Sequence, residues 1–318
     1  MTLEGVVQEL ETDLQRVGQK VREVVKSSNP LLARVTEYFL SGSGKGLRPI
    51  LVLLSGGFSK YRDDRVISLA AALELVHMAS LLHDDVIDNS DTRRGQMSVN
   101  AKWNNQIAVL LGDFFYAKAL NLVGSVGKEG VEAVAQIINT LTEGEFEQLS
   151  CQFNTLITED DYFQRIEKKT ARFIATCCKL GALYSEAPEE VVDLLSQYGF
   201  NLGMAYQIRD DILDFTANKK TLGKPVGSDL QQGIITLPVI HGINYSSKGS
   251  EIINIIKSKK PDFAAIYKII RETGSISYAQ KKAEQFSQRA RECLLPLPEC
   301  KAKNALRLIV DLTEARTS

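Results

Sequence analysis

Two aspartate runs with the same spacing are the residues best suited to chemistry in this sequence. They read DDVID at residues 84–88 and DDILD at residues 210–214, and each follows an apolar run. On an α-helix, the first and last aspartate of such a run lie about 40° apart around the axis and share a face. Oxygen ligands of this kind suit Mg²⁺, which commonly bridges carboxylates to phosphate groups. The spacing therefore predicts metal ligands at Asp84, Asp88, Asp210 and Asp214.

The middle aspartate of each run has a different expected role. Asp85 and Asp211 are turned about 100° away from the first aspartate, so we expect them to support the site from behind. A single run of this type is equally typical of a solvated helix surface. Two copies in one chain favour function, and neither copy has the glycine-containing pattern of an EF-hand loop.

Basic residues lie near both runs. The glycine-rich segment GSGKGLRP at residues 42–49 presents Lys45 and Arg48, and Arg93 and Arg94 follow the first aspartate run. The segment is not a P-loop, because Gly46 follows the lysine where Ser or Thr is required. We interpret it as a turn that binds a diphosphate. A solvated basic turn is the alternative.

The elements that position these residues are helical almost throughout. One helix is expected to begin at Pro30 after Asn29 as its N-cap and to end in the glycines of residues 42–46. Another is expected to open with a capping box of Thr158 and Asp161, and a third to extend from 188 to about 215. Residues 217–238 break the pattern and are expected to be irregular. The prediction is one all-α domain over residues 1–318.

Composition excludes several classes of function. A net charge of −1 provides no basic field for nucleic acid or for an anionic membrane. The N-terminal segment resembles no secretory signal, and no uninterrupted apolar run is long enough to span a bilayer. The 5 cysteines have no zinc spacing and are expected to be reduced thiols. We expect a cytoplasmic protein, peripheral at the membrane at most for product release.

Taken together, the motifs resemble those of the trans-isoprenyl (polyprenyl) diphosphate synthases. They occur in family order over nearly the whole chain: G-x-x-K-x-x-R-P, E-L-x-H, DDxxD-x₄-RRG, K-T, Q-x-x-DDxxD and G-K-x-x-G-x-D-L. The resemblance implies the all-helical isoprenoid (terpenoid) synthase fold, with helices around a large central cavity and the aspartate runs facing each other at its mouth. It also implies a homodimer.

The resemblance assigns roles to particular positions. The residues that match the isopentenyl diphosphate site are Lys45, Arg48, His77 and Arg94. Those that match the surroundings of the allylic diphosphate are Arg93, Lys169, Thr170, Gln207 and Lys224. The implied cofactor is Mg²⁺, with about three ions present when substrate is bound. The implied substrates are isopentenyl diphosphate and an allylic diphosphate such as farnesyl diphosphate; the implied product is an all-trans chain for a quinone side chain, passed on to a membrane.

Three positions keep alternatives. His77 has the histidine of E-L-x-H, although a hydrogen-bonded structural histidine is the ordinary expectation. Lys168 competes with Lys169, and the following Thr170 favours Lys169. Ile234 stands where many members of the family have lysine, so one cation near the allylic diphosphate is missing.

The helix before the first aspartate run is expected to act as a ruler for product length. Val76, Ala79 and Ser80 precede Asp84 by eight, five and four residues and are expected to line a channel below the reacting centre. Short-chain members of the family have an aromatic residue near these positions. The small residues here favour a product of about C30 to C40. The alternatives are a farnesyl or geranylgeranyl diphosphate synthase and a non-catalytic subunit of a heteromeric synthase.

Overall fold

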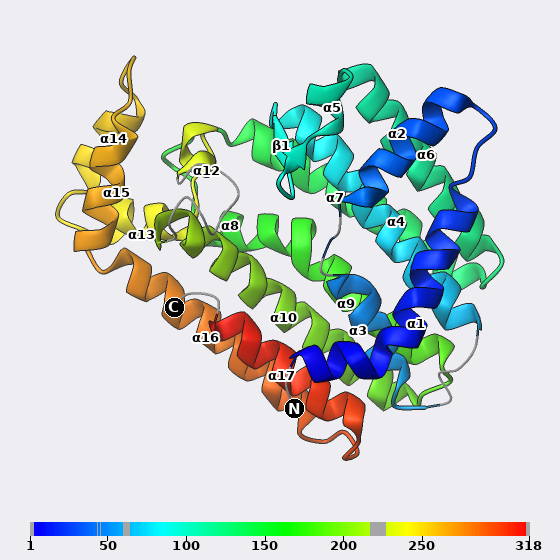
Figure 1. Cartoon of the computed structure of the whole chain (residues 1–318). Coiled ribbons are helices and arrows are strands. Elements are labelled where there is room, and N and C mark those ends of the chain that lie inside the picture. Colours follow the sequence, from blue (N-terminus) through cyan, green and yellow to red (C-terminus); the bar gives the residue numbers. More distant parts are fainter. Residues whose placement is uncertain (1–2, 43, 45, 60–63, 217–226, 316–318) are drawn as a thin grey trace. The chain divides into compact units, whose positions relative to one another are not determined.

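The computed structural model describes residues 3–42, 44, 46–59, 64–216 and 227–315 (Figure 1). Its contacts form two compact units. Unit 1 contains Met1–Asn139, Ile174–Gly199 and Leu294–Leu308, and unit 2 contains Thr140–Phe173, Phe200–Cys293 and Ile309–Ser318. The single domain expected over residues 1–318 stays a prediction.

Helices make up almost all of the described residues, which confirms the all-α fold class. The helices that begin in unit 1 are α1 (Leu3–Val24), α2 (Pro30–Ser41), α3 (Leu47–Gly56), α4 (Asp64–Ile87), α5 (Val99–Lys102), α6 (Asn105–Gly124), α7 (Lys128–Ser150), α10 (Glu189–Thr216) and α17 (Lys301–Ala315). Those that begin in unit 2 are α8 (Glu159–Ile166), the π-helix η1 (Glu167–Ala171), α9 (Arg172–Tyr184), α12 (Ser228–Gln231), α13 (Leu237–Tyr245), α14 (Gly249–Ile256), α15 (Phe263–Glu272) and α16 (Ser275–Leu294).

A small hairpin interrupts the helices directly after the first aspartate run. Strands β1 (Thr92–Arg93) and β2 (Gln96–Met97) pair antiparallel, with Arg93 opposite Gln96. The two turn residues, Arg94 and Gly95, have φ angles of 53° and 76°. Positive φ at both central positions is the geometry of a tight hairpin turn that follows the strand twist. The sequence analysis did not predict this hairpin, which sets the direction of both arginines.

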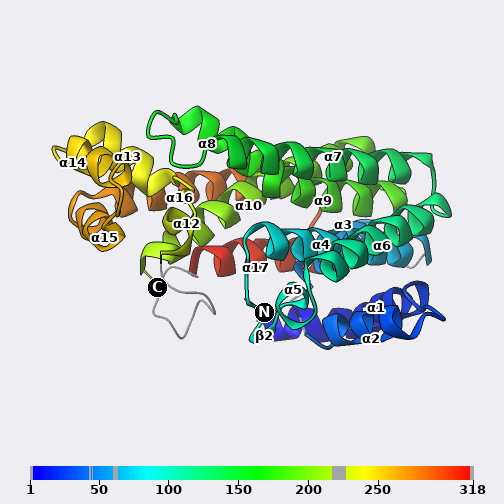
Figure 2. The same ribbon diagram turned by 90° about the horizontal axis from the view of Figure 1, so that it is seen from above.

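Helix α4 is the core of unit 1. It packs against α6, α3 and α1, and Figure 2 shows α4 beside α6. Both α4 and α6 are long and apolar enough to cross a membrane by length and composition, a result that counting uninterrupted apolar runs had missed. In α4, 72% of the most apolar window is buried inside the protein, as in the core helix of a globular protein.

The core of unit 2 gathers side chains from α8, α10 and the helices that follow. Ile208, Ile212 and Phe215 of α10 belong to one buried cluster with Ile240 of α13 and Ile266 of α15. Helices α13, α14 and α15 lie together, as both views show (Figures 1 and 2). This cluster supports the segment of α10 that carries the second aspartate run.

The expected helix ends are confirmed where the chain is described. The Asn29 side chain accepts hydrogen bonds from the Leu31 and Leu32 N–H groups, and Thr158 and Asp161 form a complete capping box. The prediction of an irregular segment at 217–238 is wrong for the second half of that range, which contains α12 and the start of α13. Pro238 lies in the first turn of α13, where a missing N–H costs nothing. Residues 217–226 lie outside the described residues.

Candidate active site

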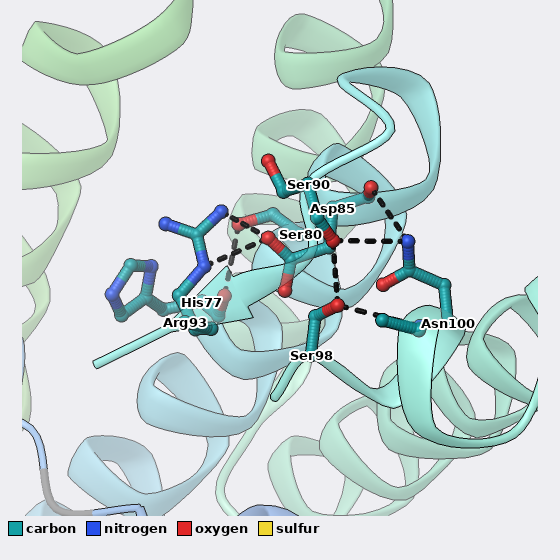
Figure 3. A network of polar contacts seen from close by, with 8 residues as sticks. His77, Ser80, Asp85, Ser90, Arg93, Ser98 and Asn100 are labelled. Carbon is teal, nitrogen blue, oxygen red and sulfur yellow. Dashed lines mark hydrogen bonds and ion pairs between the residues drawn. The ribbon is translucent and has the colours of Figure 1, made fainter. Parts of the chain in front are cut away.

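The first aspartate run occupies the last turn of α4 and the residue that follows it, Asp88. The Asp88 N–H donates to the Asp84 carbonyl at 2.8 Å, so the helical register holds through the run. Both side chains are half-buried on the same helix face. Asp85 is only 1% exposed, and its Oδ1 accepts two hydrogen bonds from the Arg93 guanidinium, with the Nε at 2.8 Å. Figure 3 shows this pair. The buried aspartate therefore fixes Arg93.

A second set of bonds fixes the turn between α4 and α5. The Asp85 carbonyl accepts the Ser90 N–H at 2.9 Å and the Asn100 amide at 3.2 Å. The Ser90 carbonyl accepts the Asn100 amide at 3.1 Å and the Ser98 hydroxyl at 2.5 Å (Figure 3). Each buried carbonyl in this turn thus has a donor, as backbone groups away from water require. The hairpin that carries Arg93 and Arg94 is held rigidly at the end of α4.

Arg94 lies on the glycine-rich turn between α2 and α3. Its guanidinium donates to the Gly42 carbonyl at 3.1 Å. A Cβ placed on Gly44 would lie 2.5 Å from the same guanidinium, so a larger residue there would move the Arg94 side chain. Arg48 follows in the first turn of α3 and is half-buried. Lys45 lies outside the described residues.

His77 lies about two turns of α4 before Asp84, close to these arginines. Burial lowers its pKa well below 6.5, and the charges of Arg48, Arg94 and Arg93 lower it further. The ring is therefore neutral at physiological pH. Its Nδ1 is buried with no hydrogen-bond partner among the described residues. A neutral imidazole with one nitrogen unused beside arginines suits a ligand oxygen better than a purely structural role.

In unit 2, a π-helix holds the lysine pair of the K-T motif. η1 inserts one extra residue into the turn between α8 and α9, a feature frequent at functional sites. Lys169 donates to Gln148 at 3.0 Å and pairs with Glu145 at 2.7 Å. Lys168, the competing candidate, pairs with Glu147. Both lysines are thus held by acidic or amide groups of α7.

Gln207 and Asp211 belong to one hydrogen-bonded chain. The Thr170 hydroxyl donates to Gln207 Oε1 at 2.7 Å, and Gln207 Nε2 donates to Asp211 Oδ1 at 2.9 Å. The Tyr162 hydroxyl donates to Asp211 Oδ2 at 2.7 Å. Burial raises the pKa of Asp211, and the two hydrogen bonds from Tyr162 and Gln207 oppose that rise. The chain connects η1 to the second aspartate run.

The two outer aspartates of the second run differ from each other. Asp210 is half-buried. Asp214 is 5% exposed, and its oxygens accept the Gly227 N–H at 3.0 Å and the Tyr267 hydroxyl at 3.5 Å. The i, i+4 spacing predicts both as metal ligands, and this assignment stays a prediction; the structure adds that the Gly227 N–H bonds to Asp214. Lys224 lies outside the described residues.

The donor set is compatible with a hard divalent cation. Among the described residues, no three His, Cys, Asp or Glu side chains converge as a ready-made metal cage. Asp84 and Asp88 instead form an accessible pair of oxygen donors on one helix face in unit 1. In unit 2, Asp210 is the more accessible of the two aspartates that were predicted to bind metal. Mg²⁺ is commonly bound by one or two carboxylates, with water and substrate phosphate as its remaining ligands. The aspartates fit that mode.

The residues expected to set product length are not equally accessible. Val76 and Ala79 have no exposed surface. Ser80 is half-buried, and its hydroxyl donates to the His77 carbonyl at 2.9 Å. Val76 and Ala79 are packed inside unit 1, and their place along a product channel stays a prediction. Ser80 is the one with accessible surface.

Several residues of the site were missed by sequence reasoning. Tyr162, Glu145 and Gln148 support the second aspartate run and Lys169, but nothing in their spacing distinguishes them from ordinary helix residues. Tyr116 of α6 lies near the first aspartate run, and burial together with the charges of Asp84 and Asp113 raises its pKa. Long-range contacts of this kind leave no local sequence signal.

An all-helical scaffold that presents paired aspartates beside arginines has the chemistry of a protein that binds a phosphate ester through a divalent cation. The family model for polyprenyl synthetase matches residues 29–273, and the chain belongs to that family.

Heptaprenyl diphosphate synthase component 2 of Bacillus subtilis (strain 168) is 37% identical over 303 residues, 94% of this chain and 87% of that protein. A crystal structure of polyprenyl synthase from Caulobacter crescentus CB15, complexed with calcium and isoprenyl diphosphate, has a TM-score of 0.92 and 28% identity. It covers 100% of this chain and 98% of that chain. The crystal structure of heptaprenyl diphosphate synthase from Staphylococcus aureus has a TM-score of 0.90 and 34% identity. The match covers 97% of this chain and 99% of that chain. The fold is that of the isoprenyl diphosphate synthases.

Proposed function

We propose that this protein is a trans-polyprenyl diphosphate synthase. It adds isopentenyl diphosphate units to an allylic diphosphate primer, farnesyl diphosphate in the first instance, and forms a new trans double bond at each step. The observation that carries the proposal is the rigid end of α4, where Asp85 fixes Arg93 and the same hairpin places Arg94 on the glycine-rich turn. Two adjacent arginines are thereby directed to different places, as two diphosphate substrates require.

Mg²⁺ is the proposed cofactor, with Asp84, Asp88, Asp210 and Asp214 as its protein ligands. When bound, it neutralises charge on the leaving diphosphate. The donor set supports a hard divalent cation, and the Caulobacter structure is named as a complex with calcium and isoprenyl diphosphate. Asp214, which is bonded to Gly227 and Tyr267, holds the chain after α10 in place.

The remaining side chains bind and orient the substrates. Arg93, with its guanidinium fixed, and Lys169 stabilise the negative charge that develops on the allylic diphosphate as its C–O bond breaks. Arg48, Arg94 and neutral His77 hold isopentenyl diphosphate by its phosphate oxygens. The apolar surroundings exclude water from the carbocation, which the isopentenyl double bond attacks.

The proposed product is a medium or long chain of about C30 to C40, since Ser80 offers the growing chain a small side chain. The Bacillus and Staphylococcus relatives are named heptaprenyl diphosphate synthases, which agrees with this range. A protein with a block beside Ser80 would instead release a short-chain product.

The test is an assay with farnesyl diphosphate, radiolabelled isopentenyl diphosphate and Mg²⁺, followed by sizing of the dephosphorylated products. We expect prenols of about C30 to C40 and no incorporation after chelation of the metal. Asp84→Ala is expected to lower the rate by about 10³-fold or more, because a metal ligand is lost. A rate for Asp84→Ala near that of the wild type would contradict the proposed site.

The assembly is proposed to be a homodimer. One observation favours a second candidate: the Bacillus relative is named as component 2 of its synthase. Light scattering of the purified protein determines its oligomeric state, and the assay above, repeated over a range of protein concentrations, shows whether the chain is active alone. Isopentenyl diphosphate binding without turnover would identify a chain that needs another component.

A further inference from the structure

Glu74 of α4 is a buried carboxylate to which the reaction described above gives no task. It is the glutamate of the E-L-x-H motif, three residues before His77. Its side chain is 7% exposed, and its Oε2 has no hydrogen-bond partner among the described residues. Leaving a charged oxygen buried and unbonded costs several kcal/mol unless opposite charges lie close by.

Opposite charges do lie close to Glu74. It lines one pocket of unit 1 with Arg94, Met78 and the glycines of the turn at 42, 44 and 46. The pKa of Glu74 is raised, because burial outweighs the charges of Arg48 and Arg94, which lower it. Among the described residues, Arg22 of α1 also lines this pocket, and Cys177 of α9 interacts electrostatically with Glu74. Neutral His77 follows Glu74 by three residues on α4, so the arginines are the groups that balance a charge on Glu74.

These are the same arginines that the proposed function assigns to isopentenyl diphosphate. A diphosphate carries more negative charge than a carboxylate and forms bidentate bonds to guanidinium groups. Once it engages Arg48 and Arg94, a buried carboxylate at Glu74 lies beside a larger anion of the same sign. Like charges and burial both favour the neutral form of a carboxyl group.

We propose that Glu74 is the resident counter-ion of Arg48 and Arg94 and takes up a proton when isopentenyl diphosphate replaces it at those arginines. The inference rests on the proposed function. The proton comes from solvent and forms an O–H bond on the Glu74 carboxyl; no other bond is made or broken, and the proton returns to solvent when the diphosphate leaves. Glu74 is a positioning residue, because it acts through the arginines.

The test is titration calorimetry of the full-length protein with isopentenyl diphosphate, without allylic substrate, in buffers of different ionisation enthalpy. The dependence of the observed heat on the buffer gives the number of protons taken up per site. Near pH 7.5 we expect the number of protons taken up per bound isopentenyl diphosphate to be larger in the wild type than in Glu74→Gln, by about half a proton or more. The variant has no carboxyl group at residue 74 to protonate. Glu251→Gln, at an exposed residue of α14 in unit 2, is the matched control and should behave as the wild type does.

The possible outcomes separate the two proposals. Equal uptake by the wild type and Glu74→Gln would overturn the role of Glu74 while leaving the synthase intact. No binding of isopentenyl diphosphate by the wild type would overturn both. If Glu74→Gln does not fold, infrared difference spectra of the wild type with and without isopentenyl diphosphate decide the matter. A protonated carboxyl band that appears on binding and shifts in Glu74→Asp supports the proposal, and its absence overturns it.

Discussion

At the scale of single residues, buried acids hold the groups that are proposed to touch substrate. Asp85 fixes Arg93, Asp211 anchors the chain from Thr170 to Tyr162, and Glu74 balances the arginines near the glycine-rich turn. Removing one partner of such a pair leaves the other buried without compensation, which costs more than the bond itself contributes. Substitutions at these positions are therefore expected to alter both stability and substrate binding.

Asp85→Asn tests the fixation of Arg93. It removes the negative charge that the guanidinium contacts, and we expect a loss of about 2 kcal/mol in the free energy of unfolding. The KM for the allylic diphosphate is expected to rise by about tenfold, because Arg93 becomes mobile. Urea denaturation and steady-state kinetics measure the two effects. Asp91→Asn, at an exposed position in the same turn, is the control and should change neither.

Tyr162→Phe tests the buried chain in unit 2. It deprives Asp211 of a donor at 2.7 Å without changing the packing volume appreciably. The expected loss in the free energy of unfolding is about 1–3 kcal/mol, the range for a buried acceptor left unsatisfied. The matched control is Tyr245→Phe, since Tyr245 is 73% exposed. The free energy of unfolding of this variant should lie within about 0.5 kcal/mol of the wild-type value. Equal effects of the two substitutions would show that the Asp211 bond contributes nothing.

At the scale of elements, close approaches between helices place the two aspartate runs. The catalytic end of α4 rests on α6 through His83, which bonds the Val109 carbonyl at 3.2 Å and lies 3.4 Å from Asp113. In unit 2, Gly144 lets α7 approach the lysines of η1. Such contacts depend on small residues at particular positions.

Gly112→Ala tests the contact between α4 and α6. A Cβ at Gly112 would lie 2.3 Å from His83 Nε2, so the imidazole must move. We expect a loss of about 2 kcal/mol in the free energy of unfolding, typical of overpacking, with lower activity. The double variant with His83→Ala should recover part of that loss. Gly124→Ala, in the same helix with open space around it, is the control and is expected to stabilise by about 0.5–1 kcal/mol.

Thr158→Ala tests the cap of α8, the helix that leads into η1. Loss of the hydroxyl bond to the Asp161 N–H is expected to cost about 1 kcal/mol. The cap also depends on pH, because bonds from Thr158 lower the pKa of Asp161 below its ordinary 3.8. The contribution of the Asp161 carboxylate is fully present above 3.8 and is lost as the pH falls through the lowered pKa. The difference between the unfolding midpoints of the wild type and Thr158→Ala should therefore narrow in acid, since only the bond to the Asp161 N–H remains; a constant difference would contradict the assignment.

At the scale of the whole molecule, the proposed reaction uses residues of both units. Unit 1 contains one aspartate run with its arginines and histidine, and unit 2 contains the other run with the lysine of η1. In the proposed function, product length depends on the space that remains for the growing chain. Ser80 is the residue of the proposed ruler with accessible surface.

Ser80→Phe is therefore the substitution expected to shorten the product. An aromatic side chain at a half-buried position can project into the space that a long chain needs, and we expect a shift of the main product by at least one prenyl unit, measured by product sizing. Ser80→Ala removes only the bond to the His77 carbonyl and should keep the product length. An unchanged product from Ser80→Phe would show that the chain does not pass this residue.

The sequence by itself determined the fold class and the family, and it supplied the candidate residues of the site. Helical periodicity, the caps at Asn29 and Thr158, and the aspartate spacing are local patterns, which depend only on residues close together in the sequence. Burial and long-range contacts depend on residues far apart in the sequence. The tertiary structure alone decided that Asp85 holds Arg93, that Asp214 is bonded to Gly227, that a π-helix carries Lys169, and that Ser80 rather than Ala79 is accessible. Each of these depends on which distant segments exclude water from a side chain, and that is settled only when the chain folds.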